Sequence, residues 1–161
     1  MAIYLVRHAK AGDRDKWSAP DHLRPLSKKG HAQATGLVGQ LGDRGITRIL
    51  SSPFVRCVQT VEPLANHLDL KVEEDDVLAE AAAPQDVAAL ARELVTEGEQ
   101  AVLCSHGDVI PLLLDHLMRV DGLRLEPEFA CAKGSTWILD ADEDESTRFV
   151  RGMYLFPPPS P

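Results

Sequence analysis

Short apolar segments that alternate with stretches of helical spacing constrain the fold of this chain more than any other feature. The strongest of these segments are almost wholly apolar and typical of strands in a buried parallel sheet: residues 2–6 (AIYLV), 48–51 (RILS) and 100–104 (QAVLC). Weaker strand patterns occupy residues 70–72, 135–139 and 149–154. Apolar residues at helical spacing predict helices over about 30–41, 53–68, 84–97 and 109–118. Strands that alternate with helices predict an α/β fold, a three-layer α/β/α sandwich with a mostly parallel central sheet.

The length and the cysteine content indicate one domain in a reducing compartment. A chain of 161 residues suffices for one hydrophobic core, and no change in composition divides it. We therefore expect a domain over residues 1–155, followed by a flexible proline-rich tail at 156–161 (FPPPSP). The three cysteines are widely spaced and form no C-x-x-C pair, which argues against a disulfide framework or a zinc site.

The distribution of charge and hydropathy narrows the location and the ligand. No segment approaches the roughly 18 apolar residues that cross a membrane, and the N-terminus has no secretory pattern, so we expect a cytoplasmic protein without a membrane partner. The net charge of −8 argues against binding to nucleic acid. Basic residues nevertheless concentrate in the N-terminal third, whereas the acidic excess lies elsewhere. This separation favours a small phosphate-type ligand.

Polar clusters follow directly after the strongest predicted strands. Arg7 and His8 end the first strand, and His106 follows the third. Arg56 lies one turn into the helix after the second strand. Because ligands of parallel α/β sheets bind beyond the carboxyl ends of the strands, we expect two imidazoles and two guanidinium groups to meet in one cleft.

These residue types suit phosphoryl transfer. A neutral imidazole is a competent nucleophile toward phosphorus, and a covalent intermediate divides one difficult displacement into two easier ones. Arginine forks bind phosphoryl oxygens in a bidentate manner, and a second histidine donates to the charge that develops in the transition state. Such catalysis needs no metal and no other cofactor, and the sequence has no cluster of carboxylates and histidines at metal-ligand spacing.

Three motifs resemble those of the histidine phosphatase superfamily, the phosphoglycerate mutase-like or RHG group: LVRHAK, SSPFVRCVQT and CSHGDV. The resemblance covers nearly the whole chain and implies a phosphoglycerate mutase-like fold. It implies that His8 is the phosphorylated nucleophile and that Arg7, Arg56 and His106 bind the phosphate. One departure is visible, because Ala9 stands where the family usually has the glycine after R-H.

Within this superfamily the chain resembles the small SixA-type phosphohistidine phosphatases, through its length and the segment RPLSKKGHAQA. It is still more similar to the phosphatase domain that lies C-terminal to a Nudix domain in some bacterial hydrolases, through RHAKAGDRDKW, VRCVQTVEPLA and KGSTWIL. The expected partner is therefore a phosphohistidine protein or a small phosphomonoester or nucleotide. The oligomeric state is left open.

Further candidates surround these motifs. Glu80 lies where larger relatives place a catalytic acid that protonates the leaving group, and a solvated loop carboxylate is the alternative. Lys10, Arg24 and Lys133 are candidate substrate-binding residues, with a solvated basic face as the alternative.

Two other functions compete with a phosphatase. A catalytically weak, phosphate-binding regulatory module has Ala9 as its only support. A mutase is disfavoured, because 161 residues leave no room for the insertions that hold and reorient an intermediate.

Overall fold

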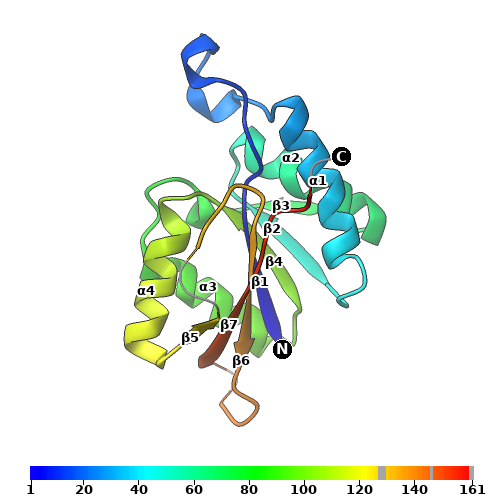
Figure 1. The fold of residues 1–161 in the computed structure, drawn as a ribbon. Helices are drawn as coiled ribbons and strands as arrows, with labels where there is room; N and C mark the ends of the chain where they lie inside the picture. The colour runs from blue at the N-terminus through cyan, green and yellow to red at the C-terminus, as the bar shows by residue number, and fades with distance from the viewer. Residues whose placement is uncertain (127–129, 146, 160–161) are drawn as a thin grey trace.

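The fold is built on one sheet of seven strands in the order β3-β2-β4-β1-β6-β7-β5 (Figure 1). The computed structural model describes residues 1–126, 130–145 and 147–159. The strands are β1 (Ala2–Arg7), β2 (Arg48–Ser51), β3 (Val72–Glu74), β4 (Ala101–Ser105), β5 (Arg124–Glu126), β6 (Thr136–Ala141) and β7 (Phe149–Leu155). Neighbours from β3 to β1 are parallel, β6 runs antiparallel to both β1 and β7, and β5 is parallel to β7. The prediction of a mostly parallel sheet is confirmed.

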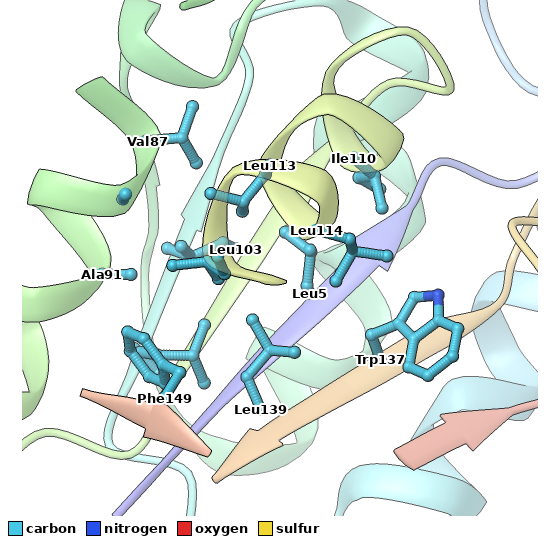
Figure 2. Close-up of a cluster of buried hydrophobic side chains, with 14 of the residues drawn as sticks. Leu5, Val87, Ala91, Leu103, Ile110, Leu113, Leu114, Trp137, Leu139 and Phe149 are labelled. Atoms are coloured by element: carbon cyan, nitrogen blue, oxygen red, sulfur yellow. The ribbon is translucent and has the colours of Figure 1, made fainter. Parts of the chain in front are cut away.

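Four helices cover the two faces of this sheet: α1 (Lys28–Leu41), α2 (Val55–Leu68), α3 (Pro84–Thr96) and α4 (Val109–Asp121). Alternate residues of β1 point to opposite faces, as the period of two in a strand requires. Ile3 and Leu5 pack into the core cluster that contains the apolar residues of α3 and α4 (Figure 2), whereas Tyr4 and Val6 belong to the cluster that contains those of α1 and α2. The three predicted layers are thus present.

Three elements differ from the prediction. Pro53 precedes its helix instead of opening it, because Phe54 is extended with ψ 134° and the helix begins at Val55. Strand β3 begins at Val72, where the predicted 70–72 segment ends. Strand β5 was not expected, since its sequence RLE has no apolar run and its backbone is stabilised by pairing with β7.

The C-terminal segment returns to α1. Gln40 donates a hydrogen bond to the carbonyl of Phe156, and Pro158 is buried beside Gly36. The predicted tail also includes residues 160 and 161, which lie outside the described residues, and its flexibility stays a prediction. In the described part of the chain, no helix is long and apolar enough to cross a membrane.

A loop of residues 11–26 extends past the carboxyl end of β1 (blue, top of Figure 1). We call it the projecting loop. It contains the short 3-10 helices η1 (Arg14–Lys16) and η2 (Asp21–Leu23). A third 3-10 helix, η3 (Asp76–Leu78), lies outside this loop and follows β3. An antiparallel bridge between Ala11 and Leu26 closes its base. The loop therefore stands over the sheet edge where β1, β2 and β4 end.

Candidate active site

A cavity of about 390 Å³ lies at this edge of the sheet. Seven of the eight residues singled out from the sequence line it, namely Arg7, His8, Arg24, Arg56, Glu80, His106 and Lys133, together with Ala11, Arg14, Gly107 and Asp108. Lys10 is exposed and is not among the lining residues. The expected meeting of two imidazoles and two guanidinium groups in one cleft is present.

The register of the parallel strands brings the two histidines together. Arg7 of β1 pairs with Ser105 of β4, and the backbone N–H of His8 continues the ladder by donating to the Ser105 carbonyl at 3.0 Å. His8 and His106 each leave a strand one residue later, so their ring centroids lie 5.4 Å apart. The chain that leaves β2 enters α2 at Val55, and Arg56 lies in the first turn of this helix.

The His8 ring is held in one tautomer. Its Nδ1 lies 2.7 Å from the carbonyl oxygen of Ala9, and since a carbonyl only accepts, Nδ1 carries the proton and Nε2 keeps its lone pair. Burial lowers the pKa of His8 to about 3; the hydrogen bond to Ala9 opposes this shift, and the charges of His106, Arg56 and Arg7 add to it. His8 is therefore a neutral imidazole at pH 7, as a nucleophile must be.

Arg56 is only 1% exposed and is held by the projecting loop. Its guanidinium donates to the Asp21 carbonyl and to Asp21 Oδ2, both at 3.0 Å, and to Glu80 Oε1 at 2.6 Å. Charge-assisted bonds of this kind are stronger than neutral ones. They fix the guanidinium at the cavity wall.

Arg7 reaches the cavity by packing against backbone. It donates to the carbonyl of Cys131 at 2.5 Å, and it lies over Gly107 at the approach to α4. A Cβ atom at position 107 would lie 2.6 Å from the Arg7 guanidinium carbon, closer than real Cβ contacts allow. A side chain at position 107 would therefore displace the Arg7 guanidinium from this position.

His106 is oriented by Ser52. The distance from Ser52 Oγ to His106 Nε2 is 2.8 Å, and Cys57 Sγ lies 3.5 Å from the same nitrogen. A hydroxyl that donates to Nε2 leaves the ring proton on Nδ1, which lies 3.6 Å from Glu80 Oε1. The contact between Ser52 and His106 becomes visible only in three dimensions.

Buried donors without acceptors mark the cavity as an anion site. Arg7 Nε, Arg56 Nε and His106 Nδ1 are buried and have no hydrogen-bond partner among the described residues. A buried donor that makes no hydrogen bond costs about 1–3 kcal/mol. Five basic residues also line the cavity against two carboxylates, although the whole chain has a net charge of −8. A phosphoryl group would supply oxygens to these donors and charge to balance them.

Asp21 holds two arginines of the site, and the sequence analysis missed it. Besides Arg56, it accepts from Arg24 Nε at 3.0 Å. Burial acts to raise the pKa of Asp21, but the hydrogen bonds and charges of Arg24 and Arg56 outweigh it and lower that pKa. Asp21 lies in a loop without periodicity, so only its spacing of three from Arg24 carries a signal, and that signal is weak.

The candidate binding residues differ in placement. Arg24 is buried and donates to the carbonyl of Gly12 at 2.6 Å, which ties it to the loop as well as to the cavity. Lys133 lines the cavity, and its pKa is lowered by burial and then by the charges of Arg7, Lys10, Arg24 and Arg14. Lys10 thus acts on the site through its charge, while its side chain lies outside the wall.

The methyl group of Ala9 points away from the cavity. Ala9 is fully buried and forms a small apolar cluster with Leu26 and Ala34. Its backbone N–H donates to Thr60 Oγ1 at 2.9 Å. The departure from the family's usual glycine therefore places no side chain where the phosphate is expected.

No metal-binding cluster is found in the described ranges: no group of three or more histidine, cysteine, aspartate or glutamate side chains there is arranged to hold an ion.

Comparisons with known proteins agree with this geometry. The sequence profile described as "Histidine phosphatase superfamily (branch 1)" matches residues 3–86. The 8-oxo-(d)GTP phosphatase of Mycolicibacterium smegmatis is 37% identical over 160 residues, which cover 97% of this chain and 48% of that protein, so the chain spans about half the length of this relative. Phosphohistidine phosphatase SixA of Escherichia coli is 34% identical over 125 residues, which cover 73% of this chain and 74% of SixA.

Solved structures show the same fold. The protein histidine phosphatase SixA in complex with tungstate has a TM-score of 0.75 at 24% identity, covering 97% of this chain and 95% of that chain. A mycobacterial glucosyl-3-phosphoglycerate phosphatase has a TM-score of 0.69 at 19% identity, covering 99% of both chains.

Proposed function

Because the chain belongs to the histidine phosphatase superfamily, we propose that it is a phosphatase and that it hydrolyses its substrate through a phosphoryl group carried on His8. The observation that carries this proposal is the neutral His8 ring, whose Nε2 lone pair is free in a cavity lined with unpartnered donors. A single domain over residues 1–155 and a cytoplasmic location belong to the same proposal.

The reaction has two steps. In the first, His8 Nε2 forms a bond to phosphorus while the bond from phosphorus to the leaving group breaks. In the second, water attacks the phosphorus, the N–P bond breaks, and inorganic phosphate is released. Arg7, Arg56 and His106 bind the phosphoryl oxygens in both steps, where preorganised donors stabilise the charge of the transition state.

Glu80 is the proposed proton donor to a leaving alkoxide. Its Oε1 already accepts from Arg56 at 2.6 Å, which leaves Oε2 for the leaving group. The imidazole that leaves phosphohistidine needs less help than an alkoxide does. The contribution of Glu80 therefore depends on the substrate.

Two kinds of substrate are supported by the relatives of this chain. One curated relative is named a phosphohistidine phosphatase and another an 8-oxo-(d)GTP phosphatase. We propose a phosphohistidine protein or a small phosphomonoester or nucleotide as substrate, with substrate contacts from Arg24 and Lys133 and a longer-range contribution from Lys10. No metal ion takes part in the proposed steps, so turnover should persist in excess chelator; loss of turnover that a divalent metal restores would contradict this part.

The alternative of a catalytically weak phosphate-binding module depended on Ala9. Because the Ala9 methyl group packs against Leu26 and Ala34, it does not obstruct the cavity, and no observation at the site favours this alternative.

The test is His8→Ala with an aryl phosphate as substrate. Loss of the nucleophile should lower kcat by at least about 10⁴-fold, as removal of a nucleophile does in other covalent enzymes. The wild type, quenched during turnover, should carry an acid-labile phosphoryl group that the variant lacks. His31→Ala is the matched control, since His31 is an exposed histidine outside the cavity. Wild-type turnover that His8→Ala retains would overturn the proposal.

A further inference from the structure

A second cavity of about 350 Å³ adjoins the first. The two share Arg14 and Glu80 as lining residues, and the second is completed by Trp17, Ala19 and Asp21 of the projecting loop. Trp17 and Ala19 do not line the first cavity, and Asp21 contributes to it only by holding Arg56. The two cavities therefore adjoin at Arg14 and Glu80.

Trp17 is fixed in this wall. Its indole N–H donates to the Pro20 carbonyl at 3.0 Å, and the side chain is half-buried. The loop around it is also held, since Asp13 accepts from the backbone N–H of Asp15 at 3.0 Å and Asp21 is bound by Arg56. The other tryptophan, Trp137, is buried in the core. An aromatic ring is thus presented at the second cavity in one orientation.

The leaving group of the proposed reaction lies on this side. In an in-line displacement, the leaving atom is opposite the attacking atom, here His8 Nε2. Glu80, the proposed proton donor to that atom, lines both cavities. A leaving group beside Glu80 therefore enters the second cavity.

The residues that line the second cavity indicate which kind of leaving group it accommodates. A rigid tryptophan is a stacking platform for a planar ring. The carboxylates of Asp21 and Glu80 disfavour an anionic ring, whereas Arg14, whose side chain is 73% exposed, is available to contact a polar spacer between the ring and the phosphate. A single amino-acid side chain attached directly to phosphorus has no such spacer.

We propose that Trp17 determines specificity by stacking on the heterocycle of a nucleotide substrate, whose terminal phosphate lies at His8. This inference deepens the proposed function and rests on it. The reaction hydrolyses the terminal phosphate: one P–O bond of the nucleotide breaks, water supplies the new oxygen, and the dephosphorylated nucleoside or nucleotide leaves.

The test compares two substrates that have the same scissile bond, a purine nucleoside 5′-monophosphate and ribose 5-phosphate. Trp17→Leu should lower the ratio of their kcat/KM values roughly 5- to 150-fold, the range for loss of one base–aromatic stack. Trp17→Phe should restore most of the ratio, because it keeps a ring but lacks the hydrogen bond to Pro20. Lys16→Ala, exposed and outside both cavities, is the control that should leave the ratio unchanged. An unchanged ratio in Trp17→Leu overturns the inference.

A binding measurement separates this inference from the proposed function. With His8→Ala, the purine nucleotide should quench tryptophan fluorescence without turnover, and Trp17→Leu added to His8→Ala should abolish the quenching. One outcome is that the nucleotide quenches the fluorescence but the wild type hydrolyses neither nucleotide nor aryl phosphate. This outcome would contradict the proposed function and support the stacking site. The opposite outcome is that an aryl phosphate phosphorylates His8 and the nucleotide causes no quenching. This outcome would support the proposed function and contradict the stacking site.

Discussion

The two ends of the sheet each carry a cavity lined with charges, and only one is built as a reactive site. The cavity at the amino end of β1 is the larger, about 870 Å³ against about 390 Å³. Among its arginines, Arg148 lies 3.4 Å from Asp142, and Arg151, whose buried Nε has no hydrogen-bond partner among the described residues, lies 4.0 Å from Glu126. At the carboxyl end, buried donors of Arg7, Arg56 and His106 lack partners and surround a neutral imidazole. Excess buried charge beside a nucleophile, and not volume, distinguishes the site.

Two arginine–carboxylate contacts repeat this contrast. Arg92 binds both oxygens of Asp121, at 2.7 and 3.0 Å, and Asp121 also accepts from the backbone N–H of Phe149. This pair ties α3, α4 and β7 together. Arg56 also binds carboxylates, but its Nε remains without a partner at the cavity. We therefore expect substitutions at the two ends to separate activity from stability.

Among the substitutions that test this comparison, the largest effect is expected for Glu80→Gln with an alkyl phosphate. Loss of the proton donor should lower kcat/KM by about 10²–10⁴-fold. A phosphohistidine peptide should be much less affected, because its leaving imidazole needs less protonation. Glu143→Gln, at the opposite cavity, is the control. Equal kcat/KM for wild type and Glu80→Gln on both substrates would make Glu80 a solvated carboxylate.

Arg56→Lys should follow, with a loss of about 10²–10³-fold in kcat, comparable to removal of one oxyanion donor. Lysine keeps the charge but lacks the planar fork that binds two oxygens. Arg148→Lys makes the same change at the amino end and should leave kcat unchanged. A greater loss in Arg148→Lys than in Arg56→Lys would reverse the assignment of the two ends.

Asp121→Asn should act on stability. The neutral amide weakens the bonds to Arg92 and to the Phe149 backbone, so the free energy of unfolding should fall by about 1.5–3 kcal/mol. Urea unfolding measures this change, and kcat at a temperature where the variant is folded should match that of the wild type. A lower kcat in the folded variant would show that the structural pair is coupled to the site.

The last prediction is a pH dependence of stability. The pKa of His8 is lowered to about 3 in the fold, so below its ordinary value of 6.5 the unfolded chain binds a proton that the folded chain does not. Stability should therefore fall as the pH falls from 6.5 toward 3, by up to about 1.4 kcal/mol per pH unit. His8→Asn should remove this contribution in urea titrations at pH 7, 6 and 5. Parallel curves for both proteins would show that His8 is not desolvated in the fold.

Most of the site was predictable because its signals are local. The apolar run that forms β1 ends at Arg7, so its backbone pairing and the position of His8 follow from adjacent residues. The same holds for β4 and His106. The helix predicted over about 30–41 was also readable from its apolar spacing, and in the structure Ser27 caps it by accepting from the Gly30 N–H. Parallel strands then bring these ends to one edge without further information.

The remainder depends on contacts between distant residues. Asp21 reaches Arg56 across 35 positions, and Ser52 reaches His106 across 54, and neither pair leaves a periodic trace in the sequence. Strand β5 was missed for the same reason, since pairing with β7 and not an apolar pattern defines it.

The sequence by itself determined the layered α/β fold and the chemistry at the ends of β1 and β4, because hydrophobic period and strand-end residues act over a few positions. Only the tertiary structure decided which polar residues face the cavity: Arg24 and Lys133 do, and Lys10 does not. The tertiary structure also places the Ala9 methyl group in an apolar cluster with Leu26 and Ala34. The physical reason is that the projecting loop has no periodicity of its own, so contacts with distant residues, such as the ion pair between Asp21 and Arg56, fix its path.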